Sequence, residues 1–111
     1  YRRLGVDRPD YDPAQGHYEA NLAEGFRLML DSHDVMRQFV DDFEPPSRND
    51  VIGLAVACDS PAEVDEVYHQ LVATGVEPVR EPWDAFWGQR YARVLDPDGN
   101  TVDLYAPLPG A

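Results

Sequence analysis

The sequence predicts an α+β fold made of two related modules with the element order strand, helix, strand, strand, strand, of which the first lacks its opening strand and most of its helix. Two observations predict this fold. The second half of the chain contains one clear amphipathic helix between extended segments, and the first half repeats the pattern of the last two of those segments. At 111 residues the chain is expected to form a single domain over 1–111, with a first module at 1–34, a linker at 35–50 and a second module at 51–108.

The clearest predicted element is a helix in "SPAEVDEVYHQLVATG". Ser60 is the expected N-cap, Pro61 suits the first turn, and Glu63 completes a capping box. Gly75 is expected to end the helix. Apolar side chains recur at the three- and four-residue spacing that places them on one face: Val64, Val67, Tyr68, Leu71 and Val72. This face is expected to pack on a core.

Extended segments surround the helix. "VIGLAVAC" precedes it and is short and rich in β-branched residues, so it is predicted to be a buried strand with Cys58 as a buried thiol. "GVEPV", "GQRYARVL" and "TVDLYA" follow the helix. The last two are expected to form a hairpin closed by "DPDGN", in which Gly99 takes a positive φ.

The first half of the chain echoes these later elements. "LGVD" parallels "TGVE", and "GHYEANL" followed by "GFRLMLD" parallels the hairpin of the second half, which indicates a duplicated unit. If the two units are equivalent, "YRRLG" is the last turn of a helix, and the rest of that helix and the opening strand would lie upstream of Tyr1. The segment "VMRQFVDDFEPPSRND", rich in proline and charge, is predicted to connect the modules.

Composition excludes several classes of protein. The chain has 21 acidic and 9 basic residues and a net charge of −12, which argues against binding to nucleic acid. No apolar run approaches the ~20 residues of a membrane span, and no signal peptide is apparent. We expect a cytoplasmic protein without an internal disulfide, since Cys58 is the single cysteine.

The aspartate-rich "DPDGNTVD" does not fit a calcium loop of the EF-hand type. Counted from Asp96, the sixth position holds Thr101 instead of glycine and the twelfth holds Pro107 instead of glutamate. Turn chemistry explains Asp96 to Asn100 without a metal.

The segment "PWDAFWGQRYARVLDPDGNTVDLYAPL", with "DSPAEVDEVYHQLVATG" before it, resembles the vicinal oxygen chelate superfamily, which includes glyoxalase I, bleomycin-resistance proteins and extradiol dioxygenases. The resemblance implies a glyoxalase-like fold of paired βαβββ modules, in which two curled half-sheets form a groove. It also implies that metal-using members carry a carboxylate on the final strand of each module and a His or Glu on each opening strand.

At those implied positions this chain has Asp103, Met29 and Gly53, and the fourth position lies upstream of Tyr1. Of the three visible residues, only Asp103 can bind a metal. A catalytic ion normally needs three or more protein ligands, so we expect no cofactor. A divalent metal whose site is completed elsewhere is the alternative.

The two-residue period of strands predicts which side chains line the groove. Alternation places Asp103 beside Thr101 and Tyr105, while Val102 and Leu104 turn toward the helices. The dense aromatic stretch "EPWDAFWGQRY" can form core, a dimer contact or a stacking platform for a planar ligand. The predicted ligand-binding residues are Glu19, Met29, Trp83, Trp87, Tyr91, Arg93, Asp103 and Tyr105.

The resemblance and the missing metal ligands together predict binding or sequestration of a small, cationic aromatic molecule such as an antibiotic, with Asp103 pairing with its charge. The alternative is a metal-dependent lyase, isomerase or dioxygenase of the same superfamily. A metal-independent enzyme that uses His17, Glu19 or Tyr91 as acid or base, and a protein that binds another protein, also stay open. No catalytic residue is singled out, and a homodimer is expected, as is common among relatives.

Overall fold

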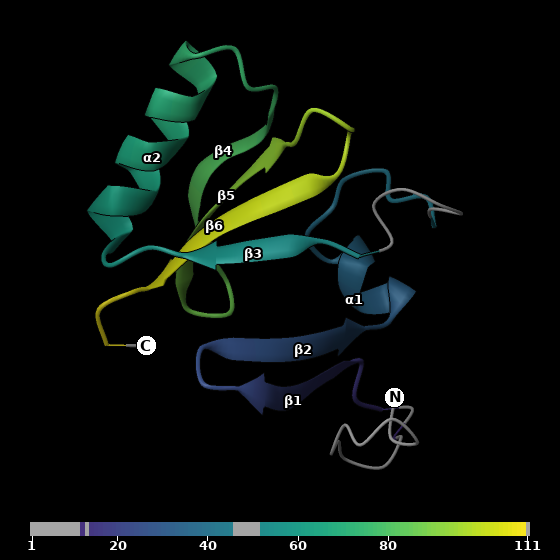
Figure 1. The fold of residues 1–111 in the computed structure, drawn as a ribbon. Coiled ribbons are helices and arrows are strands. Elements are labelled where there is room, and N and C mark those ends of the chain that lie inside the picture. The colour runs from purple at the N-terminus through teal and green to yellow at the C-terminus, as the bar shows by residue number, and fades with distance from the viewer. Residues whose placement is uncertain (1–11, 13, 46–51, 111) are drawn as a thin grey trace. The chain divides into compact units, whose positions relative to one another are not determined.

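The computed structural model describes residue 12, residues 14–45 and residues 52–110. The predicted helix end "YRRLG" lies outside these ranges. Residues 46–51, which include the end of the predicted linker, also lie outside them. The chain divides into two compact units, Tyr1–Pro45 and Pro46–Ala111, shown in Figure 1. Each unit is described by itself.

The second unit has the predicted strand, helix and three-strand order. It consists of β3 (Leu54–Ala57), α2 (Pro61–Ala73), β4 (Pro78–Ala85), β5 (Gln89–Leu95) and β6 (Thr101–Pro107). The strands form one sheet in the order β3-β6-β5-β4, in which β3 runs parallel to β6 and the other pairs are antiparallel (Figure 1). The α+β class and a complete βαβββ module are thereby confirmed.

Helix α2 begins and ends where its sequence predicts. The Ser60 side chain accepts a hydrogen bond from the Glu63 backbone N–H at 3.1 Å. The Glu63 carboxylate accepts in return from the N–H of Asp59 at 2.9 Å, one residue before the N-cap. After the helix, Gly75 takes a φ of +98°, a conformation that a residue with a Cβ rarely adopts.

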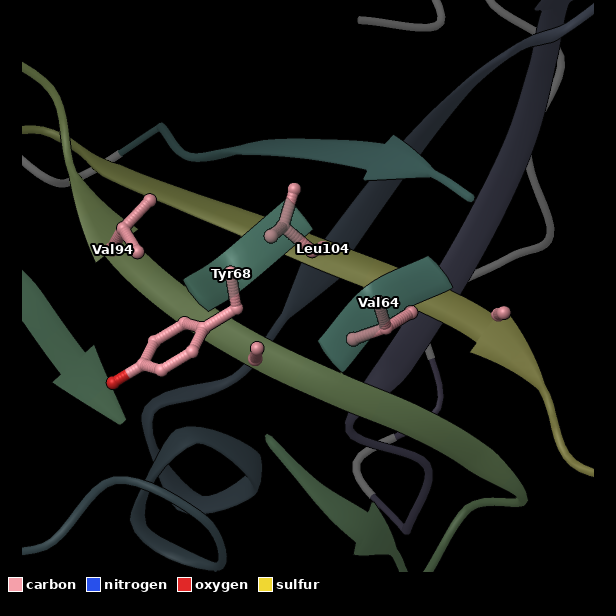
Figure 2. Packing of buried hydrophobic residues seen from close by; sticks show 6 residues of the cluster. Val64, Tyr68, Val94 and Leu104 are labelled. Carbon is pink, nitrogen blue, oxygen red and sulfur yellow. The ribbon is translucent and has the colours of Figure 1, made fainter. Parts of the chain in front are cut away.

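The core of this unit lies between α2 and one face of the sheet. Val64 and Tyr68 of the helix pack against buried side chains of β5 and β6, as Figure 2 shows. The sheet residues of this cluster are Ala92, Val94, Leu104 and Ala106. Because side chains alternate along a strand, the residues between them point to the opposite face, as predicted.

Strand β3 differs from its prediction. It forms where expected, but Leu54 is 64% and Val56 is 49% exposed, so the expectation of a buried strand is wrong. The physical reason is its position: β3 is an edge strand, and α2 packs on β4, β5 and β6. Cys58, just after the strand, is half-buried against the core, and burial raises the pKa of its thiol.

The turn between β5 and β6 uses Asp96 as its cap. The Asp96 carboxylate accepts from the backbone N–H groups of Asp98 at 2.9 Å and Asn100 at 2.8 Å. The bond from the Asn100 backbone is the main reason why the pKa of Asp96 is lowered. Gly99 takes a φ of +84° as expected. The predicted turn, with aspartate capping, is confirmed.

The first unit contains the predicted hairpin of β1 (His17–Ala23) and β2 (Phe26–Asp31), joined through Gly25. A short helix, α1 (His33–Arg37), follows it, with Ser32 as N-cap. This helix was not predicted, since its residues were assigned to the end of the first module and to the linker.

Candidate functional site

The face of the second unit's sheet opposite α2, here called the open face, carries six of the eight predicted ligand-binding residues. The register explains why they come together. Tyr91 of β5 lies directly opposite Trp83 of β4 on one side and Tyr105 of β6 on the other. Two residues further along β5, Arg93 lies opposite Asp103 of β6. Directly opposed residues share a face, so these side chains form two adjacent rows.

The first row belongs to an aromatic cluster, defined as Trp83, Phe86, Trp87, Tyr91 and Tyr105. Tyr91 is its centre: its ring centroid lies 5.3 Å from that of Trp83 and 5.1 Å from that of Trp87, both edge to face. The Tyr105 ring lies 6.5 Å away in a stacked arrangement. Edge-to-face ring pairs contribute about 0.5–1.5 kcal/mol each beyond the area that they bury.

The loop between β4 and β5 places two further rings. Gly88 takes a φ of +91° and closes a tight turn through its N–H, which donates to the Ala85 carbonyl at 3.0 Å. The Trp87 indole N–H donates to the Gln89 side chain at 2.7 Å, which fixes the ring over the sheet. Phe86 packs edge to face on Trp87 and is largely exposed. The glycine is therefore required by the turn that presents these rings.

Arg80 completes this region and was not among the predicted site residues. Its guanidinium carbon lies 3.7 Å from the centroid of the Trp83 ring, within the range of a strong cation–π contact. The pairing of β4 with β5 is irregular on both sides of Arg80, so the positions of Arg80 and Trp83 do not follow the two-residue alternation of a regular strand. A two-residue period therefore could not have found it.

Asp103 lies on the open face as predicted, but its contacts differ from the expected role. One carboxylate oxygen, Oδ1, accepts from Arg93 Nε at 2.9 Å, and the other, Oδ2, accepts from the Tyr91 hydroxyl at 2.6 Å. Both side chains of the ion pair are largely buried, Arg93 at 9% and Asp103 at 14% exposure. The carboxylate is thus already paired inside the protein, which leaves the predicted pairing of Asp103 with the charge of a guest without support.

The residues at the metal positions do not form a metal site. Asp103 is bonded to Arg93 and Tyr91, Gly53 has no side chain, and the thioether of Met29 is a poor ligand for hard divalent ions. Across residues 12, 14–45 and 52–110, no group of three or more His, Cys, Asp or Glu side chains is arranged to hold a metal ion.

The other two predicted residues, Glu19 and Met29, lie opposite each other on the hairpin of the first unit. Beside them, His17 makes hydrogen bonds with both Asp31 and Glu19, the latter at 3.0 Å. Burial alone would lower the pKa of His17, but the bonds to Glu19 and Asp31 and their negative charges raise it overall. The bond from His17 in turn lowers the pKa of Glu19. This arrangement favours the imidazolium form, in which both ring nitrogens donate.

A second ion pair lies on the α2 side of the same sheet. Arg90 donates from Nε and Nη2 to the two carboxylate oxygens of Asp65, at 2.8 and 3.0 Å, and from Nη1 to Asp84 at 3.1 Å. The hydrogen bonds to Asp65 are the main cause that raises the pKa of Arg90. This pair ties α2 to the sheet and takes no part in the open face.

The fold and the residues matched define the class of the protein. The sequence profile of the glyoxalase/bleomycin resistance protein/dioxygenase superfamily matches residues 1–104, and the chain belongs to this superfamily. The resemblance to vicinal oxygen chelate proteins is thereby confirmed. A search of curated proteins finds no match.

Several solved structures are similar to this chain. A glyoxalase/bleomycin resistance protein/dioxygenase from Nocardioides is 29% identical, with a TM-score of 0.54, and the match covers 97% of this chain and 71% of that one. A family enzyme from Burkholderia phytofirmans is 17% identical, with a TM-score of 0.52 and coverage of 95% and 82%. An NAD-dependent benzaldehyde dehydrogenase structure from Legionella pneumophila is 18% identical, with a TM-score of 0.66 and coverage of 96% and 82%. The last two are similar in fold alone.

Within the described ranges, no helix is long and apolar enough to cross a membrane.

Proposed function

We propose that this protein binds a small aromatic organic molecule on the open face of its second module, without a catalytic metal, and thereby sequesters or carries it. The observation that supports this most is the aromatic cluster. Four of its rings are half-buried and one is largely exposed, so they keep accessible surface although they contact one another. Rings arranged in this way offer a planar guest both stacking and edge contacts.

The rings also support a preference for a positively charged guest. Asp103 is neutralised by Arg93, so a cation would be attracted by the ring faces instead of by this carboxylate. The Arg80 guanidinium over Trp83 is an example, within the protein, of the contact that a planar cation would make with the remaining ring faces of the cluster, and it supports this preference. The net charge of −12 adds a long-range attraction for cations.

Three planar probes of similar shape and different charge test this proposal: aminoacridine, which is cationic, anthracenemethanol, which is neutral, and anthracenecarboxylate, which is anionic. Isothermal titration calorimetry should show binding in the order cation, neutral, anion. Failure of all three to bind at concentrations well above micromolar would overturn the proposal, and an anion bound most tightly would overturn the charge preference.

Matched variants locate the site. Trp83→Ala removes a ring with an arginine over its face and should weaken aminoacridine binding about tenfold. Phe43→Ala removes a ring of the first unit that also has an arginine near its face, Arg37 at 5.8 Å, and should leave binding unchanged. Equal losses in both variants would argue against a site on the open face.

Enzymatic activity is the second candidate function, and the environment of His17 favours it. A histidine bonded to two carboxylates is a competent acid–base group. The hemithioacetal of methylglyoxal and glutathione, the type of substrate used by glyoxalase I, is a suitable test. Isomerisation that persists with a chelator and is lost in His17→Asn would establish metal-independent catalysis.

Metal analysis of the purified protein tests the metal-dependent alternative. Stoichiometric Ni, Zn, Fe or Mn that disappears in Asp103→Ala would overturn the metal-free proposal. A homodimer and a cytoplasmic location are further parts of the proposal, and sedimentation of the purified protein tests the first of these.

A further inference from the structure

We propose that Asp103 and Arg93 are positioning residues, which hold the Tyr91 ring at the centre of the aromatic cluster and so determine which planar shape the cluster accepts. This inference rests on the proposed binding function. It differs from the role that the sequence suggested for Asp103, because the carboxylate acts through Tyr91 and not by contact with the ligand.

Tyr91 has a central place among the rings. Its ring contacts Trp83, Trp87 and Tyr105, which come from three different segments of the chain. A rotation of this one ring therefore changes its contact with all three neighbours. The strand backbone fixes the start of the side chain but leaves the tilt of the ring free within its broad rotamer range.

The hydrogen bond to Asp103 restrains that tilt at its far end. The Tyr91 hydroxyl donates to Oδ2 at 2.6 Å, a short distance typical of a bond to an ionised carboxylate. Such bonds are about twice as strong as bonds between neutral groups. The ring is thus fixed at both ends, by the β5 backbone and by its hydroxyl.

The carboxylate is fixed in turn by Arg93. Arg93 Nε donates to Oδ1 at 2.9 Å, and the two residues lie directly opposite each other on β5 and β6. Both oxygens of Asp103 therefore accept a bond from a different donor. An asparagine can accept from Arg93 through its oxygen, but it then presents an uncharged amide to Tyr91, so the Tyr91 hydroxyl loses its bond to an ionised carboxylate.

The first test is the near-ultraviolet circular dichroism of the free protein, which reports the fixed packing of aromatic rings. Asp103→Asn and Tyr91→Phe should each remove much of the tryptophan part of the signal, to which neither tyrosine nor phenylalanine contributes. The double variant should lose no more of it than the stronger single variant, because both break the same bond. Asp65→Asn is the matched control. It breaks the ion pair of Arg90 on the α2 side of the same strand and should leave the signal unchanged.

The second test is the ratio of affinities for aminoacridine, with three fused rings, and aminoquinoline, with two. A loss of stability alone does not alter this ratio in protein that is fully folded. Asp103→Asn and Tyr91→Phe should change it about tenfold, while Asp65→Asn should not.

The outcomes separate the two proposals. A wild-type protein that binds neither probe refutes the proposed function, while the dichroism still decides whether Asp103 positions Tyr91. A wild-type signal and a wild-type ratio in Asp103→Asn would overturn the positioning role. If Asp103→Asn does not fold, Tyr91→Phe decides instead, because it leaves the ion pair of Arg93 and Asp103 in place.

Discussion

The two ion pairs of strand β5 should differ widely in what their loss costs. In Asp103→Asn, the Arg93 charge stays behind in a site where its side chain is 9% exposed and its former partner 14% exposed. Removing one member of a buried ion pair costs about 3–5 kcal/mol, because the remaining charge has lost its oppositely charged partner in a site that is largely closed to water. In Asp65→Asn, the partners are 25% and 40% exposed, and water and Asp84 can still solvate Arg90. The expected cost there is about 1 kcal/mol or less.

Urea denaturation followed by far-ultraviolet circular dichroism measures both changes. We expect Asp103→Asn to reduce the free energy of unfolding of the second unit by at least ~3 kcal/mol, which for a domain of this size lowers the melting temperature by roughly 12–24 °C. A second variant, Arg93→Met with Asp103→Leu, should recover a large part of the loss, since it removes the charge together with its partner. Equal costs for Asp103→Asn and Asp65→Asn would refute the reasoning from burial.

Three further predictions concern local features. The pKa of His17 is raised above 6.5, so its bonds to Asp31 and Glu19 stabilise the fold below that pH, and this contribution is lost as the pH rises through the folded-state pKa. Because the side chain is about half exposed, this contribution to the free energy of unfolding should be below ~1 kcal/mol. In urea denaturation, the difference in the free energy of unfolding between wild type and His17→Asn should be larger at about pH 6 than at about pH 9. Ser60→Ala removes the cap of α2 and should cost ~1 kcal/mol in the same assay, whereas Ser60→Asp should keep most of the stability. Gly99→Ala should cost about 1 kcal/mol; no atom lies within 4 Å of the added Cβ, so a loss well above this would point to a cause other than its φ of +84°.

Local chemistry explains why much of the second unit could be predicted from its sequence. Helix α2 carries its cap at Ser60 and its end signal at Gly75, and the β5–β6 turn carries Asp96 and Gly99. These signals act over a few residues, and the sequence contains all of them. The two-residue period then placed Asp103 on the correct face.

The pairing of Asp103 was within reach but was not predicted. The turn fixes Leu95 opposite Thr101, and counting two residues outward on each strand places Arg93 opposite Asp103. Alternation predicts only the face of the sheet on which a residue lies. To predict the residue opposite it on the neighbouring strand, the register of the two strands must also be known. Register follows from the length of the turn.

Two other features could not have been predicted in this way. The exposure of β3 depends on where α2 packs, which no pattern within "VIGLAVAC" contains. The stacking of Arg80 on Trp83 depends on two irregularities in β4 that interrupt the strand period. The first is a consequence of tertiary packing, which acts between segments that are distant in sequence, and the second of strand irregularities that the two-residue pattern does not contain.

The exposed strand β3 has a consequence for the behaviour of the protein in solution. Among the described residues, no strand pairs with the outer edge of β3, and an edge strand with unpaired backbone groups and apolar side chains attracts other strands at short range. β3 contains no lysine or proline to prevent this. The net charge of −12 opposes such contacts at long range. Salt shortens that repulsion from about 10 Å at 0.1 M to about 3 Å at 1 M while leaving the apolar attraction in place. Light scattering should therefore show self-association that increases with ionic strength. An interface held together by ion pairs would show the opposite dependence. The substitution Val56→Lys should suppress the self-association.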